Sequence, residues 1–293
     1  MTEIERLVGE FHRRSGVAPA TRDFYRWNLE RLLVPFCARE GLQRPGQLTA
    51  DVIDRLGREV EAYRKQDGSP LAPASRRAYM KAVQQFLAWL RDRHATAGLQ
   101  PREVPVPPRR RVRRTVPTRE EIQALEDAAP TERNKLIIRI MGDTGAREGE
   151  IAHLRRDALV AKGGRYFYLE VEGKTGARTV PISARLHSRL ATYRGRAGHL
   201  FPSRAGGALT EKGVYLVVRD AVARAELGRR IYPHLLRHAA ITWMLAPREK
   251  GGKGLPPSYV VEITGVSQAV ISASYDHPSQ EQLWDAMATG GWS

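Results

Sequence analysis

The chain contains a single cysteine, Cys37, among its 293 residues. One cysteine can form neither an internal disulfide nor a cysteine-based zinc cluster, so both are excluded. Long hydrophobic runs are also absent: the apolar stretch 136–141 contains an arginine, and no stretch approaches the ~20 apolar residues of a membrane span. The acidic N-terminus lacks the apolar core of a signal peptide. These absences predict a cytoplasmic protein.

Acidic residues and lysines are scarce beside arginine. The chain has 48 Lys+Arg against 32 Asp+Glu, a net charge of +16, and only 8 of the 48 are lysines. A positive excess of this size is typical of proteins that bind a polyanion, and the planar guanidinium of arginine grips phosphate with two hydrogen bonds. A GC-rich genome accounts for part of the arginine bias but not for the net excess. We therefore expect DNA or RNA binding.

Residues 1–99 have the periodicity of a small helical bundle. Helices are predicted over 21–40, 48–66 and 75–94, with Thr21 and Thr49 as N-caps of the first two. Within them, Trp27 and Trp89 are predicted to be rings of the core. With 42% hydrophobic residues, the chain is rich enough in apolar side chains to build a core of this kind. We therefore expect residues 1–99 to form a small bundle of three or four helices.

Residues 100–117 differ in composition from both flanks. Five prolines disfavour helix and inner strand, and they predict a linker between two domains. The linker is strongly basic, and we expect it to lie along a phosphate backbone. The residues that carry this expectation are Arg109, Arg110, Arg111, Arg113 and Arg114.

Residues 118–293 are predicted to form a second domain, mainly α with a small β-sheet. Thr118 and Glu121 have the spacing of a capping box, and a buried helix is expected over 134–145. Residues 164–183 alternate, turn at GKTG and alternate again, which predicts a β-hairpin. Further helices are expected over 183–194, 210–226, 235–246, 256–263 and 280–289.

The GKTG turn is not a phosphate-binding loop. That loop requires a glycine five positions before the Gly of its Gly-Lys pair, and Tyr168 stands there instead. No ATP is implied. A more informative stretch follows the helix at 134–145: Arg147 comes after a glycine turn, and Glu150 lies three residues later on the same face of the next helix. By itself this pair also fits a surface arginine in a local ion pair.

Two further stretches supply groups for phosphate chemistry. His234 and Arg237 lie three apart on a helix that begins at Pro233, a spacing that suits binding of one phosphate, although a solvated basic helix face has the same pattern. Tyr275 is a poor nucleophile at neutral pH unless cations stabilise its phenolate. Together with Arg147 and Lys174, these residues have the chemistry needed to attack a DNA phosphodiester.

At this point the sequence resembles the tyrosine recombinase, or phage integrase, family over its whole length. Four motifs match in the order in which that family has them. The matching residues are Thr144, Gly145, Arg147 and Glu150 in the first, Lys174 in the hairpin turn, His234, Arg237 and His238 in the third, and Gly265 with Tyr275 in the last. Each motif is weak alone, but four in order are specific.

The resemblance implies a helical core-binding domain, a catalytic domain and a site-specific recombinase mechanism. Tyr275 would attack the scissile phosphate of double-stranded DNA and leave a 3′-phosphotyrosyl link, with Lys174 as general acid and His234 as proton acceptor. Arg147 and Arg237 would stabilise the transition state, and Glu150 and His238 would support the site.

The resemblance also implies how the enzyme is assembled and what it does without. Neither a metal nor a cofactor is implied, because the protein–DNA ester conserves the bond energy. Four protomers would act on two DNA sites by exchanging a C-terminal helix, in the cytoplasm and associated with the nucleoid.

One position departs from the family pattern. Val266 stands where the family has a His or Trp that donates a hydrogen bond to the scissile phosphate, and loss of one such donor costs ~10²–10³ in rate. Three interpretations stay open: the enzyme cleaves slowly, another group such as His277 or a bound water makes the contact, or the protein binds DNA without cutting it. A transposase or topoisomerase-like relative with the same tyrosine chemistry is a further alternative.

Overall fold

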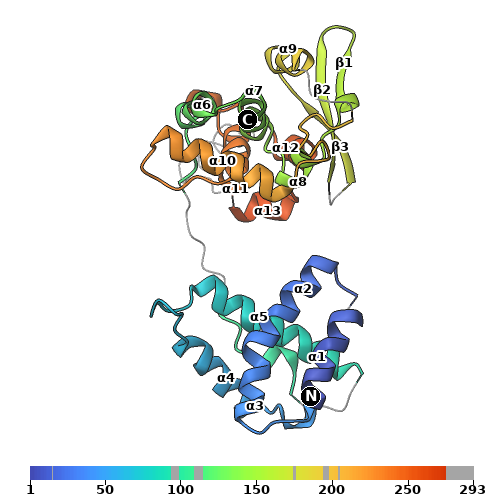
Figure 1. Ribbon diagram of the computed structural model, residues 1–293, viewed down its shortest axis with the longest axis vertical. Coiled ribbons are helices and arrows are strands. Elements are labelled where there is room, and N and C mark those ends of the chain that lie inside the picture. The colour runs from blue at the N-terminus through green and yellow to red at the C-terminus, as the bar shows by residue number, and fades with distance from the viewer. Residues whose placement is uncertain are drawn as a thin grey trace, which may run out of the picture. The chain divides into compact units, whose positions relative to one another are not determined.

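The structure is a computed structural model, which describes residues 1–14, 16–93, 99–108, 115–173, 176–193, 198–203 and 205–274. The chain divides into two compact units, Met1–Arg113 and Arg114–Ser293 (Figure 1). The described part of the first unit consists of helices and loops, and the second adds a small sheet to its helices. The predicted fold class, mainly α with a small sheet, is confirmed.

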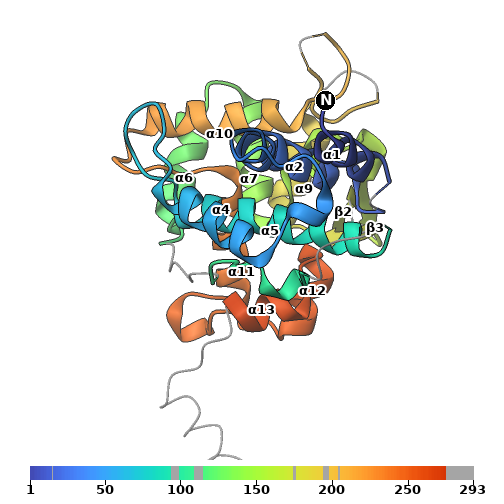
Figure 2. The same ribbon diagram turned by 90° about the horizontal axis from the view of Figure 1, so that it is seen from below.

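The N-terminal unit is a bundle of α-helices around one apolar core. Its α-helices are α1 (Glu3–Arg14), α2 (Pro19–Asn28), α3 (Val34–Arg39), α4 (Ala50–Ala62) and α5 (Pro73–Arg91). Helices α1 and α2 lie side by side (Figures 1 and 2). The hydroxyl of Thr49 caps α4 by accepting a hydrogen bond from the Val52 amide at 3.4 Å, as predicted. Helix α2 begins at Pro19, so the prediction of Thr21 as its N-cap is wrong.

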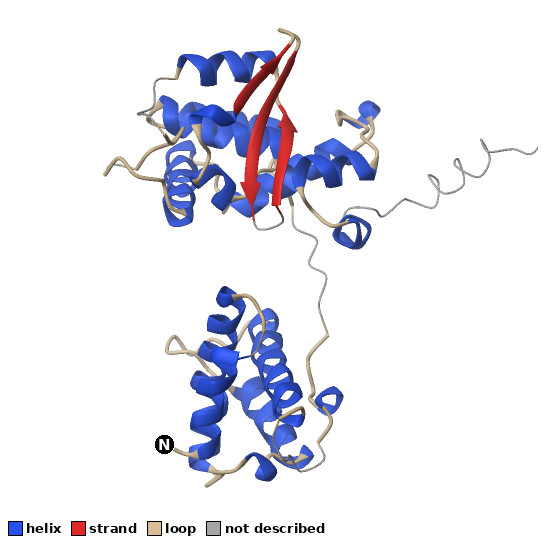
Figure 3. Ribbon diagram, turned by 90° about the vertical axis from the view of Figure 1, so that its right-hand side faces the viewer, coloured by secondary structure: helices blue, strands red, loops and turns tan. Residues whose placement is uncertain are grey.

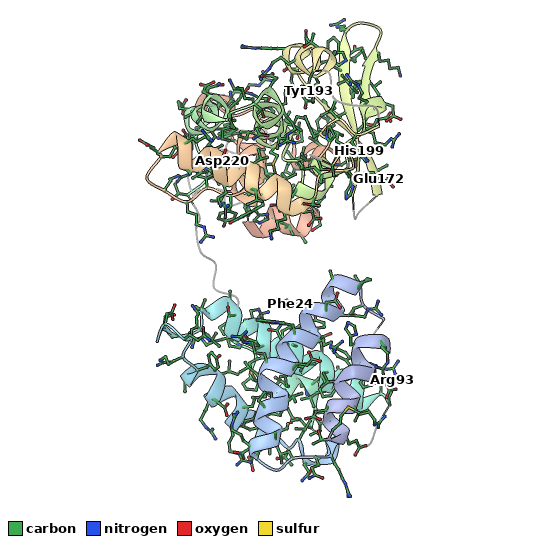
Figure 4. All side chains as sticks on the ribbon, in the orientation of Figure 1. Phe24, Arg93, Glu172, Tyr193, His199 and Asp220 are labelled. Carbon is green, nitrogen blue, oxygen red and sulfur yellow. The ribbon has the colours of Figure 1, made fainter. Side chains whose placement is uncertain are left out.

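The predicted helix over 21–40 is interrupted by a π-helical segment, Leu29–Leu33, between α2 and α3. Pro35 follows it, and proline has no amide hydrogen and crowds the carbonyl four residues earlier. A π segment shifts the helical register, so residues on either side of it do not share one face. Leu32 and Phe36 are accordingly buried, whereas Phe24, which is labelled in Figure 4, is 47% exposed.

The same shift changes the environment of Trp27. Its side chain is 52% exposed, so the prediction that it is a core ring is wrong. It stacks on Tyr79 with ring centroids 6.1 Å apart, and the guanidinium of Arg31 lies 5.1 Å from its ring centroid. Trp89 is buried, and that prediction is confirmed.

Residues 99–108 pack on the N-terminal unit. Leu99 and Val104 are buried in its core, on either side of the short 3-10 helix Pro101–Glu103. Arg77 of α5 donates a hydrogen bond to the Pro107 carbonyl at 2.5 Å. The run of arginines over 109–114 lies outside the described residues.

The C-terminal unit surrounds a second apolar core. Its α-helices are α6 (Arg119–Ala128), α7 (Glu132–Thr144), α8 (Glu148–Ala152), α9 (Ala184–Thr192), α10 (Glu211–Ala225), α11 (Pro233–Leu245), α12 (Pro257–Thr264) and α13 (Gln268–Ser274). The predicted capping box of α6 is present, because Thr118 and Glu121 exchange backbone-to-side-chain hydrogen bonds of 2.8 and 3.2 Å. The helix predicted over 280–289 lies outside the described residues.

The sheet is antiparallel with the strand order β1-β2-β3, and helices lie behind it in Figure 3. Strands β2 (Tyr166–Gly173) and β3 (Gly176–Pro181) form the predicted hairpin. The sequence reasoning missed β1 (Leu159–Lys162). A signal for it was present in the Gly163–Gly164 pair, a turn sequence; in the structure both glycines have positive φ, in the three-residue connection between Lys162 and Tyr166.

None of the helices in the described ranges combines the length and the hydrophobicity that a bilayer crossing needs.

Candidate active site

Helices α7 and α12 end with the same arrangement. Each ends in a Thr-Gly pair in which the glycine is left-handed, with φ of +67° at Gly145 and +62° at Gly265. The hydroxyl of Thr264 donates to the Val260 carbonyl at 2.6 Å and accepts from the Val266 amide at 3.3 Å. Thr144 makes the equivalent bonds in α7. A left-handed glycine turns the chain sharply at a helix end, so both helices stop with carbonyls exposed to neighbouring side chains.

Arg237 of α11 joins these two helix ends. Its guanidinium donates one hydrogen bond to the Gly145 carbonyl and another, of 2.9 Å, to the Thr264 carbonyl. The side chain is buried, with 7% exposed. Its charge is stabilised there by the negative ends of two helix dipoles. Two motifs 119 residues apart in the sequence, counted from Gly145 to Thr264, therefore meet at this arginine.

Arg147 lies in the turn before α8 and contacts both Glu150 and the end of α12. Its Nη1 donates to Glu150 Oε1 at 2.9 Å, the local ion pair that the spacing of the two residues also fitted, and its Nη2 donates to the Gly265 carbonyl at 2.7 Å. The Arg147 amide also donates to Glu150 Oε2 at 2.7 Å. A third of the arginine side chain, 34%, stays exposed, which leaves it open to an anion from solution.

A third arginine, Arg178 of β3, was missed by the sequence reasoning. It binds Glu150 with both terminal nitrogens, at 2.5 and 2.7 Å, and its Nε donates to the Ile263 carbonyl at 2.9 Å. A signal for it existed: Arg178 pairs directly with Val171, whose side chain is buried, so the hairpin register places an arginine on the inner face. An inward arginine requires an anionic or carbonyl partner.

Three consecutive carbonyls at the end of α12 thus each accept a hydrogen bond from a different arginine. Ile263 accepts from Arg178, Thr264 from Arg237 and Gly265 from Arg147. The last carbonyls of a helix have no partner within the helix and carry the negative end of its dipole. This helix end therefore gathers arginines from β3, from α11 and from the turn before α8.

The carboxylate of Glu150 is held ionised in the middle of this cluster. Burial by itself raises the pKa of Glu150, but the hydrogen bonds and charges of Arg178 and Arg147 outweigh it and lower the pKa to about 2. The residue is 2% exposed. The hairpin leaves no spare room, since a Cβ built on Gly173 would lie 2.6 Å from Glu150 Oε1. The adjacent Glu172 is labelled in Figure 4.

Helix α11 carries the third motif. The rings of His234 and His238 meet edge to face with centroids 4.4 Å apart. His234 is exposed and His238 half-buried. Arg237, between them in sequence, points to the two helix ends. The structure therefore presents an imidazole at the surface of the same helix that supplies the buried guanidinium.

Val266 is a packed side chain. It is 9% exposed, in a cluster with Ala240, Ile241 and Met244 of α11, Val260 of α12 and Ile271 of α13. A hydrophobic residue just after a left-handed glycine commonly packs back against its helix. Ala146, which follows Gly145, is buried in the same way. The valine thus anchors α13 to α11 and α12, and its side chain offers no hydrogen-bond donor.

The remaining predicted site residues lie outside the described residues. They are Lys174, Tyr275, and the linker residues Arg109, Arg110, Arg111, Arg113 and Arg114. In the sequence, Lys174 stands between the end of β2 and the start of β3, and Tyr275 directly follows the last residue of α13.

Among the described site residues, Arg147 and His234 reach solvent, whereas Glu150, Arg178 and Arg237 are largely buried. The C-terminal unit has a cavity of about 650 Å³ between α6, α7 and α11, but no arginine, histidine or glutamate named above lines it. Among the described residues, no group of three or more His, Cys, Asp and Glu side chains is placed to hold a metal ion. The cation that stays exposed, Arg147, lies outside this cavity, which suits an extended polyanion better than an enclosed small molecule.

Comparison with known proteins agrees with this geometry. Residues 116–282 match the Phage integrase family, and the chain belongs to it. It is 25% identical to the tyrosine recombinase XerC of Xanthomonas campestris over 97% of this chain and 86% of that protein. The chain is a tyrosine recombinase, an enzyme of site-specific DNA recombination, as the sequence predicts.

Solved structures share the fold. The XerH recombinase bound to a palindromic difH substrate, in a post-cleavage complex, has a TM-score of 0.70 and 18% identity, with 97% of this chain and 84% of that one covered. A lambda integrase tetramer bound to a Holliday junction has a TM-score of 0.67 and 17% identity, with 92% and 78% covered.

The depressed pKa of Glu150 predicts an acid-labile contribution to stability. The pKa of this carboxyl is lower in the folded protein than in the unfolded chain. Its ionised form therefore stabilises the fold at any pH above the pKa of the unfolded chain, and this stabilisation is lost as the pH falls toward the folded pKa of about 2. When the pH is lowered from 6 to 3, we expect the free energy of unfolding to fall by about 2 kcal/mol because of this group. Urea denaturation at both pH values measures the loss, which should be smaller by that amount in Glu150→Gln. An equal loss in the two proteins contradicts the prediction.

Proposed function

We propose that this chain cuts and rejoins duplex DNA through a 3′-phosphotyrosyl intermediate formed by Tyr275. The observation that supports this most is the joining of Arg147 and Arg237 at the end of α12. From that helix end the chain passes through Val266 into α13, whose last residue immediately precedes Tyr275. The helix end to which the arginines donate is therefore followed, after α13, by the tyrosine.

In the proposed cleavage step, the hydroxyl oxygen of Tyr275 attacks the scissile phosphorus and its proton passes to His234. The bond from phosphorus to the 5′-oxygen breaks, and Lys174 protonates that oxygen. The exposed part of Arg147 binds the non-bridging oxygens, where negative charge develops. Rejoining is the reverse attack by a 5′-hydroxyl, so the ester conserves the bond energy and no cofactor is consumed.

The two arginines differ in what they offer the phosphate. Arg147 is one-third exposed, whereas Arg237 is 7% exposed and bonded to two carbonyls. We propose that Arg147 is the principal phosphate ligand and that Arg237 presents only one edge to the DNA while it holds the two helix ends together. Glu150 and His238 support these groups from behind.

The N-terminal unit offers a surface for DNA. A shallow hollow between α2 and α5 is lined by the exposed Phe24 and by Arg77 and Lys81. Trp27, with Arg31 over its ring, is also exposed on α2. Cationic side chains beside exposed aromatic rings are suited to a nucleic-acid backbone and its sugars. We propose that this face and the linker arginines bind the duplex, in the cytoplasm with the nucleoid.

Tyr275→Phe should abolish covalent attachment to DNA. On a nicked suicide substrate carrying the cognate site, wild type should accumulate an SDS-resistant protein–DNA adduct, and Tyr275→Phe should form none because it lacks the attacking oxygen. Tyr259→Phe is the matched control, since Tyr259 is an exposed tyrosine of α12, and it should form as much adduct as wild type.

The same assay tests the alternatives. If wild type binds the site but forms no adduct, the chain is a DNA-binding protein without cleavage activity. If it forms the adduct but only relaxes supercoiled DNA and does not excise a segment between two sites, the activity is topoisomerase-like.

Val266→Ala should affect stability more than cleavage. The valine donates no hydrogen bond, so the adduct should form within about threefold of the wild-type rate, while removal of two buried methyl groups should cost about 2 kcal/mol of unfolding free energy. Val260→Ala in the same cluster is the stability control. Val266→His should be less stable still and no faster. If Val266→His instead cleaves faster than wild type, this position can reach the phosphate.

Strand exchange should depend on the C-terminal segment. We propose that four protomers act on two DNA sites and exchange this segment, for which the sequence predicts an apolar helix edge of Leu283, Trp284 and Met287. Trp284→Ala should form the adduct on a single site at the wild-type level but lose assembly of two sites, scored by native gel and by excision. Gln282→Ala, beside that edge, should behave as wild type. Normal excision by Trp284→Ala counts against the exchange.

A further inference from the structure

Arg178 is not among the residues that match the four motifs, yet it contacts the centre of the cluster. Its guanidinium binds both oxygens of Glu150 and the carbonyl of Ile263, so each of its three nitrogens donates a hydrogen bond. The side chain is 10% exposed. An arginine used in this way is turned toward the protein and not toward an external phosphate.

The partners of Arg178 are themselves tied to Arg147. Glu150 accepts two hydrogen bonds from Arg178 and two from Arg147, one from its amide and one from its side chain. Ile263 lies two residues before Gly265, whose carbonyl accepts a hydrogen bond from the other terminal nitrogen of Arg147, Nη2. The guanidinium of Arg147 is fixed by Glu150 and by the Gly265 carbonyl. Arg178 bonds directly to Glu150 and, through Ile263, to the helix end that carries Gly265, so it holds both partners of Arg147 in place.

We propose that Arg178 is a positioning residue for DNA cleavage, which sets the orientation of Arg147 by clamping Glu150 and the end of α12 to strand β3. The inference rests on the proposed recombinase function. Because β3 follows the turn in which the sequence has Lys174, the same clamp joins the base of that hairpin to the helix that leads to Tyr275. Misplacement of a reacting or binding group by about 1 Å is enough to cost about 100-fold in rate.

The charged groups around Glu150 explain why Arg178 is required. On the described elements that pack around it, the two cations that contact the carboxylate are Arg178 from β3 and Arg147 from the turn before α8. β2 contributes the bare backbone of Gly173. From α10, Glu211 lies against Gly149 and interacts with Glu148, so it adds only negative charge to this helix. Without Arg178, one guanidinium remains to hold a buried carboxylate ionised.

Lysine is not expected to replace this arginine fully. A planar guanidinium binds the two carboxylate oxygens side by side and still reaches a carbonyl with Nε, whereas an ammonium is a single point charge. Arg178→Lys should keep Glu150 ionised but lose the geometry. Arg178→Met, which keeps an unbranched apolar side chain without the guanidinium, should lose both.

The test measures DNA affinity and the single-turnover rate of adduct formation separately, on the nicked substrate at pH 6 and pH 8.5. Arg178→Met should bind DNA within about threefold of wild type but cleave about 100-fold more slowly at pH 6. Part of the rate should return at pH 8.5, because burial raises the pKa of Glu150 once Arg178 is gone and the carboxylate ionises only at higher pH. Arg178→Lys should be slow at both pH values, without that extra recovery.

Arg165→Met is the matched control. Arg165 is exposed and lies just before β2, at the end of the strand away from Gly173 and Glu150, with its guanidinium beside the ring of Tyr166. Its variant should cleave as wild type does. Adduct formation by wild type and Arg165→Met establishes the proposed function independently of Arg178.

Two results overturn the inference. One is Arg178→Met cleaving at the wild-type rate at both pH values. The other is a rate that falls by one factor at both pH values and only in proportion to the folded fraction seen by circular dichroism, which would make Arg178 merely structural. Failure of wild type to form an adduct overturns the proposed function and, with it, this inference.

Discussion

The end of α12 is the feature on which the candidate site depends. Its last carbonyls, of Ile263, Thr264 and Gly265, cannot be satisfied inside the helix, and each accepts a hydrogen bond from a different arginine. The arginines come from three separate segments of the C-terminal unit. A helix end is fixed in position by its own backbone, so it can hold mobile, mutually repelling side chains in one arrangement before any DNA is present.

The charges of this cluster do not balance, and the excess is positive, which suits binding of a phosphate. The cluster contains three guanidinium groups, of Arg147, Arg178 and Arg237, and one buried carboxylate, Glu150, which leaves two positive charges in excess among these four groups. The helix dipole and the carbonyls compensate part of that excess. Arg147 alone among the three keeps a large exposed fraction. The cluster is therefore stable without ligand but directs its uncompensated charge toward solvent at one arginine.

Packing and hydrogen bonding compete at Val266. The position follows a left-handed glycine, where the chain turns and the next side chain can fold back on the helix. Valine uses the position for packing and secures α13, the helix that precedes Tyr275. A donor side chain at the same place would have to leave this apolar cluster to reach a phosphate. At this position the chain therefore has an apolar contact that packs α13 against α11 and α12.

Much of this was determined by the sequence alone: the helical class, the hairpin, the capping box at Thr118, and the motifs that define a tyrosine recombinase, because each depends on residues close together in the chain. The exposure of Trp27 was missed because a π segment before Pro35 shifts the helical register. Only the tertiary structure revealed Arg178, since its partners Glu150 and Ile263 are 28 and 85 residues away. Spacing reports which residues share a face of one element, but three elements must pack before their arginines can meet at one helix end.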